Sequence, residues 1–215
     1  IVFLGTGAAS YIDLAAAERL GIRVRTYGGY GDQSVPEHAL GLIVAAAAPL
    51  HADVTRFRIQ PEASEVAFRA TSRLMNADGR FSRFAGDVTV DPADLNTARV
   101  TVRVEAASLD TGITMRDRHL RSEDFFHVEK FPAITFESLR VEGAGRRLLV
   151  VGRLTLRGVT REVRVPVDVS VAGNRLEARG QFDVKRTDHR MIYDSTMNPI
   201  GDRVRIEFAF RAEAP

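Results

Sequence analysis

Apolar and polar residues alternate over most of the chain that follows residue 55. Every second residue is apolar in 100–106, in 163–171 and again in 204–210. An alternation with this period gives a β-strand one apolar face and one solvent-exposed face. Similar runs lie at 66–70, 84–90, 134–141, 148–156 and 176–184. The pattern therefore predicts about eight strands in this part of the sequence.

The order of these strands predicts a mainly β fold. Helical connections between them are almost absent, so we expect consecutive strands to pair in an antiparallel sheet. Evenly spaced strands are typical of a β-sandwich and of a closed barrel, and alternation alone does not separate the two. A packed core and a hollow interior would also share the same apolar, Phe-rich inner face.

One segment interrupts the strands. Residues 111–126 (TGITMRDRHLRSEDFF) are charged and permissive for a helix. The apolar side chains within it, Met115, Leu120, Phe125 and Phe126, are suited to cover the opening of a barrel. This long insertion between two strands is therefore predicted to form a helical lid.

The first fifty residues have a different pattern. The apolar run 1–4 predicts a strand, residues 14–20 predict a helix that ends at Gly21, and residues 22–24 alternate like a second strand. A further helix is predicted to begin near Ser34, where the sequence fits an N-terminal capping box. This part of the chain is thus expected to form a short α/β-like segment in front of the β domain.

Composition limits the partners and the chemistry. The 215 residues include no Cys, which excludes disulfides, thiolate catalysis and Cys-ligated zinc. The formal net charge is only +2 and the arginines lack interleaved aromatic residues, so we expect no nucleic-acid partner. The longest apolar run, residues 39–50, is too short to span a bilayer as a helix, and no stable membrane insertion is expected. Its length suits a signal-peptide h-region, which predicts cleavage after Ala52 and a periplasmic or secreted protein.

The histidines and hydroxyl groups give little support for catalysis. His119 and His127 are eight residues apart, which is not the spacing of paired metal ligands, so no metal site is expected. Ser108, Asp110 and His119 contain the residue types of a catalytic triad, but no Ser lies in a nucleophile-elbow context. We therefore expect no catalytic residues, no cofactor and no enzymatic activity. His189 lies in a turn-like stretch and is predicted to be at the surface.

Residues 116–136 (RDRHLRSEDFFHVEKFPAITF) resemble the characteristic run of the YceI-like, or polyisoprenoid-binding, family. Further matches lie in register at 79–86, 91–92, 107–112 and 152–160. The resemblance covers residues 55–211. It implies an eight-stranded antiparallel, lipocalin-like β-barrel with a tunnel for isoprenoids or other long-chain amphiphiles, usually in the periplasm. The family often has a His where Arg73 stands here, so a polar contact by that His is not carried over.

The resemblance and the alternation together predict which side chains meet the lipid. The expected lipid-binding residues are Phe68, Phe84, Val102, Met115, Leu120, Phe125, Phe126, Phe136, Leu154 and Phe208. Arg116, Arg118 and Arg121 form a candidate head-group site, because guanidinium groups bind phosphate and carboxylate oxygens bidentately. A solvated, salt-bridged helix is the simpler interpretation of the same arginines. Formation of a homodimer is left open.

A second resemblance concerns the start of the chain. Residues 5–7, 12–17, 20–24 and 30–38 resemble a fragment of the substrate domain of D-isomer-specific 2-hydroxyacid dehydrogenases. The nucleotide-binding half of that family has no counterpart in the sequence. We therefore divide the chain into an N-terminal segment, 1–52, and a barrel, 53–215, that carries or sequesters an isoprenoid-like lipid. Two alternatives stay open: a barrel with a filled core that binds partners through its Arg-rich surface, and, with less support, a dehydrogenase remnant with activity.

Overall fold

The computed structural model separates the chain into two compact units, Ile1–His51 and Ala52–Pro215. The residues that it describes are 2–3, 12–26, 54–73, 76–193 and 198–215. In the first unit, β1 (Val2–Phe3) pairs in parallel with β2 (Arg25–Thr26), and α1 (Leu14–Arg19) lies between them in the sequence.

The predictions for this first unit are only partly confirmed. The helix expected at 14–20 is present as α1, and the Asp13 side chain caps it by accepting a backbone N–H bond at 2.9 Å. The strand expected at 22–24 is wrong, because the pairing strand is β2, farther along the chain. The helix predicted near Ser34 and the apolar run 39–50 lie outside the described residues.

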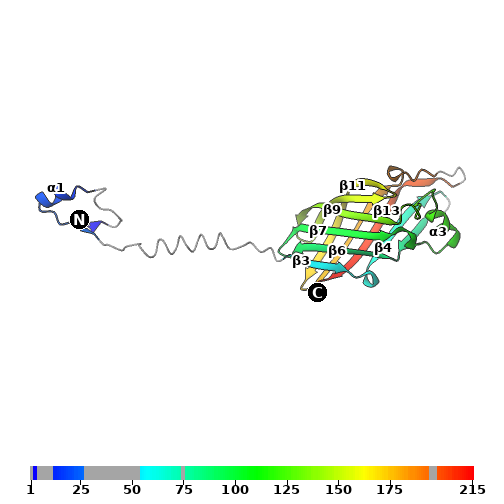
Figure 1. Cartoon of the computed structure of the whole chain (residues 1–215), viewed down its shortest axis with the longest axis horizontal. Helices are drawn as coiled ribbons and strands as arrows, with labels where there is room; N and C mark the ends of the chain where they lie inside the picture. Colours follow the sequence, from blue (N-terminus) through cyan, green and yellow to red (C-terminus); the bar gives the residue numbers. More distant parts are fainter. Residues whose placement is uncertain (1, 4–11, 27–53, 74–75, 194–197) are drawn as a thin grey trace. The chain divides into compact units, whose positions relative to one another are not determined.

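The second unit is a closed antiparallel barrel of eight strands (Figure 1). In order around the ring, the strands are β3 (Thr55–Ile59), β6 (Phe84–Asp91), β7 (Asp94–Glu105), β9 (Ala133–Ala144), β10 (Arg147–Leu156), β11 (Val159–Ala172), β12 (Arg175–Lys185) and β13 (Ile200–Glu213). The ring closes because β13 pairs along the length of β12 and, at its last residues, with β3. The predicted eight-stranded antiparallel barrel is therefore confirmed.

Three further strands extend the wall beside β13. β4 (Glu65–Ser72) pairs with β13, β5 (Ala77–Phe81) pairs with β4, and β8 (Leu109–Asp110) pairs with β5. β3 and β4 are separated only by the 3₁₀ turn η2 (Pro61–Ala63). Pro61 interrupts the strand at this turn, so β3 before the turn and β4 after it both pair with β13.

The lid insertion predicted at 111–126 contains one helix, α3 (Thr114–Arg121). It lies at one end of the barrel, and the C-terminus lies at the other end (Figure 1). The short 3₁₀ turns η3 (Ala106–Ser108) and η4 (Thr187–His189) follow β7 and β12, at the ends of these strands that face α3. We call the end of the barrel that carries α3 the mouth.

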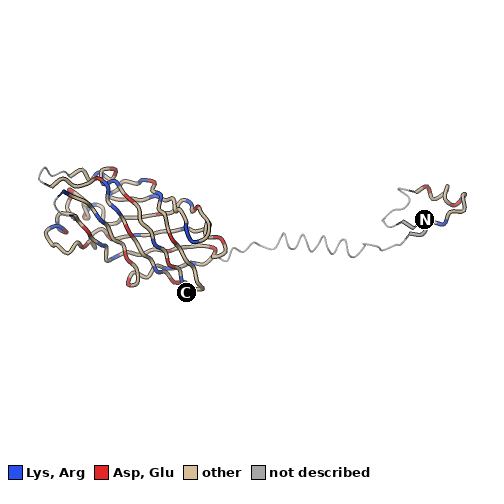
Figure 2. The backbone as a smooth tube through the Cα atoms, turned by 180° about the vertical axis from the view of Figure 1, so that it is seen from behind, with Lys and Arg blue, Asp and Glu red and all other residues tan. Residues whose placement is uncertain are grey.

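The outer wall carries charges of both signs along its strands (Figure 2). Arg83 Nε lies 2.6 Å from Glu105 Oε2, and Arg69 Nε lies 2.7 Å from Asp78 Oδ1. These hydrogen bonds raise the pKa of both guanidinium groups. The pairs are exposed and contribute little to stability. They nevertheless place carboxylates beside the arginines, which weakens the alternative of an Arg-rich binding surface.

His189 was predicted to be at the surface, and the structure contradicts this, because only 1% of the residue is exposed. Its Nδ1 lies 3.1 Å from the carbonyl oxygen of Val159 and 3.3 Å from that of Leu156, so Nδ1 carries a proton and donates. The turn η4 thus directs its imidazole inward, against the β10–β11 connection. Burial lowers the pKa of His189, because the charged ring would lose its hydration.

We expect the barrel to lose stability as the pH falls below about 6.5, the ordinary pKa of His. The unfolded chain takes up a proton at His189 at that pH, whereas the folded chain does so only at a lower pH. The stabilisation is therefore complete above the unfolded pKa and is lost as the pH falls through the folded pKa. Thermal unfolding of the parent and of His189→Gln, which keeps a donor but does not titrate, measures the effect. The Tm of the variant should depend less on pH than the Tm of the parent. Equal slopes of Tm against pH would show that His189 does not cause the loss of stability.

Candidate functional site

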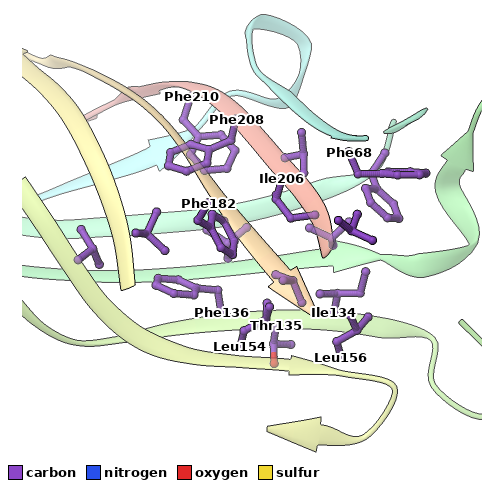
Figure 3. Close-up of a pocket in the computed structure, with 18 of the residues that line it drawn as sticks. Phe68, Ile134, Thr135, Phe136, Leu154, Leu156, Phe182, Ile206, Phe208 and Phe210 are labelled. Carbon is purple, nitrogen blue, oxygen red and sulfur yellow. The ribbon is translucent and has the colours of Figure 1, made fainter. Parts of the chain in front are cut away.

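The barrel encloses a cavity of about 740 Å³, a volume typical of ligand-binding pockets. Every strand of the ring contributes side chains to its wall. Phe136, Phe182, Phe208 and Phe210 point into it from three different strands (Figure 3). Because the wall is almost entirely apolar, the cavity suits an apolar ligand.

The inner face of the barrel is not packed against itself. Phe136, Ile206 and Phe208 face the interior and yet stay only half-buried. By contrast, Phe57 and Val151 do not line the cavity and are fully buried. In a close-packed core the inner side chains would be buried as completely as these two. The interior is therefore hollow, which argues against the alternative of a filled core.

Two glycines make room for aromatic rings on this wall. A Cβ atom on Gly152 would lie 2.4 Å from the ring of Phe136, and one on Gly180 would lie 2.6 Å from the ring of Phe208. Each ring thus occupies the space that a side chain of the neighbouring strand would need. This close approach keeps both rings along the wall and leaves the centre of the barrel open.

The structure places nine of the ten predicted lipid-binding residues on the cavity wall. Phe84 is the exception. It is buried at the start of β6 and packs against Phe210, with 6.0 Å between the ring centroids. Phe84 therefore supports a wall residue instead of lining the cavity itself. Contact of the other nine with a lipid stays a prediction.

Polar side chains line the cavity at the mouth. They are Ser72, Arg116, His119, Thr135, Arg186, Tyr193 and Asn198. They come from α3, from strand ends that face α3, and from the chain between β12 and β13. The lining residues toward the opposite end, such as Val141, Leu148 and Leu176, are apolar. A ligand with one long apolar chain and one polar end fits this gradient with its polar end at the mouth.

Two of the three predicted head-group arginines hold α3 in place. Arg116 donates from Nε to Thr111 Oγ1 at 2.8 Å and from Nη2 to the carbonyl oxygen of Thr111 at 2.9 Å. Arg121 donates from Nε to the carbonyl oxygen of Ala107 at 3.0 Å. Arg118 is exposed on the helix. These contacts give Arg116 and Arg121 an anchoring role, and a head-group role for the three arginines stays a prediction.

His119 lies in an aromatic cluster at the mouth. Its Nε2 is 3.1 Å from Asp124 Oδ2, and its ring packs edge-on against Phe125 and Tyr193, at 5.0 and 4.8 Å between centroids. The hydroxyl of Ser108 instead donates to a backbone carbonyl at 2.7 Å. The residues weighed as a triad are thus bonded to other groups. No cluster of metal-ligating side chains occurs within the described part of the chain.

Sequence reasoning missed Arg186, a buried residue at the mouth. Its guanidinium donates to the carbonyl oxygens of Met191 at 2.6 Å, Tyr193 at 2.9 Å, Ile200 at 3.2 Å and Gly201 at 3.3 Å. These carbonyl dipoles replace the water that a buried guanidinium would otherwise lose. Arg186 thereby ties the chain that follows η4 to the start of β13.

A second arginine links the two sides of the mouth. Arg157, in the β10–β11 turn, donates from Nη2 to the carbonyl oxygen of Glu123 at 2.5 Å and from Nη1 to that of Arg190. Glu123 follows α3, and Arg190 follows η4. The lid segment and the η4 segment are therefore held to the same turn.

Comparison with known sequences agrees with this architecture. Residues 57–212 match the YceI-like domain. A UPF0312 protein of Vibrio parahaemolyticus is 34% identical over 140 residues, which are 63% of this chain and 74% of that protein. A UPF0312 protein of Photorhabdus laumondii is 44% identical over 85 residues, or 40% of this chain and 44% of that one.

Solved structures share the fold. BcnA of Burkholderia cenocepacia aligns with a TM-score of 0.67 at 26% identity and covers 71% of this chain and 98% of its own. A polyisoprenoid binding domain from Saccharophagus degradans, at 19% identity, aligns with a TM-score of 0.62 over 75% of this chain and 99% of its own. Since the matched residues 57–212 make up most of the chain and coincide with the barrel, the protein belongs to the YceI-like domain family.

Proposed function

We propose that the barrel binds a long-chain, isoprenoid-like lipid in its cavity and carries or sequesters it without changing it chemically. The observation that carries the proposal is a hollow interior of about 740 Å³ with an almost wholly apolar wall. Each buried CH₂ group contributes about 0.8 kcal/mol, so a long chain binds without any polar contact inside. The Saccharophagus degradans domain of the same fold is described as polyisoprenoid-binding, which supports this class of ligand.

The distribution of polar residues supports one orientation of the ligand. The apolar chain fills the end of the barrel opposite the mouth, and the polar end of the lipid lies near His119, Arg186 and Tyr193 at the mouth. We further place this function in the periplasm. The apolar run 39–50, with the length of a signal-peptide h-region, supports export with cleavage after Ala52.

Native mass spectrometry of the protein, purified without detergent from the cells that produce it, tests both parts of the proposal. We expect an added mass of one lipid on the folded protein, which disappears on denaturation, and a polypeptide that begins at Asp53. A folded protein with no added mass would count against lipid carriage. A polypeptide that retains the residues before Ala52 would count against export.

A further inference from the structure

Large apolar side chains are exposed around the mouth. Met115 on α3 is 82% exposed, Ile192 after η4 is 76% exposed, and Ile113 directly before α3 is 41% exposed. The rings of His119 and Tyr193 pack at 4.8 Å between centroids and join α3 to the segment that carries Ile192. We therefore treat Ile113, Met115 and Ile192 as one feature, named the apolar rim.

The apolar rim stands out from the rest of the barrel surface. Among the described residues from 54 onward, the other exposed large apolar side chain is Val54, directly before β3 and away from α3. Met115 also lines the cavity, whereas Ile113 and Ile192 do not. Because Met115 is exposed and also lines the cavity, the cavity opens to the surface at this place. Ile113 and Ile192 are exposed to solvent beside the opening, although neither of them lines the cavity. Exposed apolar side chains gathered around an opening indicate an interaction surface.

Arginines accompany the apolar rim. Arg118 follows Met115 by about one turn of α3, and Arg190 precedes Ile192 by two residues. Arg73 lies at the end of β4, where its N–H donates to the carbonyl oxygen of Pro199 at 3.3 Å. All three arginines are exposed. Apolar tips flanked by guanidinium groups are typical of protein surfaces that insert shallowly into a bilayer with anionic head groups.

Acidic residues are present at this end as well. Glu123, Asp124 and Asp188 are exposed, so the net charge of the mouth is not strongly positive. The apolar side chains must therefore supply most of the binding. None of the helices in the described part of the chain is long and apolar enough to cross a bilayer. Shallow contact through the apolar rim needs no such helix.

We propose that the mouth docks on the surface of a phospholipid bilayer through the apolar rim, so that a lipid passes between the membrane and the cavity. This inference rests on the proposed function, because it gives the route by which the ligand enters. A long apolar chain that crosses water exposes its whole surface, which is strongly unfavourable. A mouth seated on the bilayer removes this step from the path.

The absence of Trp from the chain allows a direct test. Ile192→Trp places a single reporter on the apolar rim, and Ala93→Trp places one in the exposed β6–β7 turn, away from α3. Each variant is mixed with vesicles of phosphatidylglycerol and phosphatidylcholine, and its fluorescence emission is recorded. We expect a blue shift for Ile192→Trp and no shift for Ala93→Trp. No shift for Ile192→Trp, or equal shifts for both variants, would overturn docking through the mouth.

A second pair of variants separates docking from lipid binding. Ile113→Ser and Ile192→Ser are combined, and Val54→Ser serves as the matched control. The double variant should sediment with vesicles at least tenfold less than the parent, whereas the control should sediment like the parent. Because neither isoleucine lines the cavity, geranylgeraniol delivered from detergent should still bind the double variant.

Three further outcomes separate membrane docking from lipid carriage and from self-association. Unchanged sedimentation of the double variant would overturn the docking proposal while leaving lipid carriage intact. If the parent itself does not bind geranylgeraniol delivered from detergent, the proposed function is wrong. A shift of the Ile192→Trp emission with protein concentration, in the absence of vesicles, would identify the apolar rim as a contact between two copies of the chain and would overturn membrane docking.

Discussion

Val102→Phe is expected to leave the barrel nearly as stable as the parent, whereas Val151→Phe should destabilise it by about 1–3 kcal/mol. Both variants add the same atoms to a strand of the ring. Val102 is half-buried on the cavity wall, and the added ring can enter empty space. Val151 is fully buried in packed protein, and the ring must displace its neighbours. Urea unfolding of the three proteins measures the difference.

Val102→Phe and Val151→Phe should also differ in how tightly they bind a lipid. A Phe at position 102 takes space from the lipid chain, and the loss of about two buried CH₂ groups weakens binding by about 15-fold. Val151→Phe leaves the cavity wall unchanged and should bind geranylgeraniol like the parent, provided that the assay is run where it is folded. Equal destabilisation by both substitutions would show that the interior is packed, and the account of a hollow barrel would fail.

Arg186→Met is expected to lower the free energy of unfolding by about 3 kcal/mol, which corresponds to a fall in Tm of about 6–12 °C. The guanidinium of Arg186 donates to four backbone carbonyls, of which those of Met191 and Tyr193 lie at 2.6 and 2.9 Å. Met fills the same space but donates no hydrogen bond, so carbonyl groups at the mouth are left without their partner. Thermal unfolding followed by circular dichroism measures the loss.

Two control variants show whether the loss of stability comes from the hydrogen bonds of Arg186. Arg69→Met removes an exposed arginine that pairs with Asp78 across neighbouring strands, and it should melt close to the parent. Arg186→Lys keeps the charge but lacks the planar fork, so it should recover only part of the lost stability. A Tm for Arg186→Met as high as that of Arg69→Met would mean that the hydrogen bonds of Arg186 do not hold the mouth together.

The barrel could be predicted from the sequence because strand alternation is a local signal. The runs at 100–105, 163–171 and 204–210 lie in β7, β11 and β13, with their apolar residues inward, and Ala106 begins η3. β3 and β5 were not identified, since each is only five residues long. β3 carries two buried apolar residues, Phe57 and Ile59, and this is too few to establish a period. The closure of the ring depends on that short strand, so alternation alone could not separate barrel from sandwich.

The candidate site could be predicted only in part. Nine of the ten expected lipid-binding residues line the cavity. Five of them lie on strands, where the same alternation fixes the inward face, and the other four lie in the predicted lid segment 111–126. The hollow centre could not be predicted from alternation. An apolar strand face has the same sequence pattern whether it packs against other side chains or lines a cavity. The placement of Gly152 and Gly180 opposite aromatic rings is a relation between strands, and no single segment reveals it.

The polar residues at the mouth were the least predictable part. Arg186 and His189 lie in an ordinary polar stretch, and both turn inward because nearby backbone carbonyls accept their hydrogen bonds. Arg116 and Arg121 were considered only as candidate head-group residues or as part of a solvated helix, and the contacts of their guanidinium groups with backbone near α3 were not predicted. Such side-chain-to-backbone contacts depend on tertiary arrangement, which residue type and spacing do not encode.

The affinity of the delipidated barrel for geraniol, farnesol and geranylgeraniol tests the central claim most directly. The three alcohols share one head group and differ only in the number of isoprene units. Because each buried CH₂ contributes about 0.8 kcal/mol, the affinity should rise at least about tenfold with each added unit while the chain still fits in the cavity. Equal affinities for the three alcohols, or no binding of any, would contradict a barrel that holds long apolar chains.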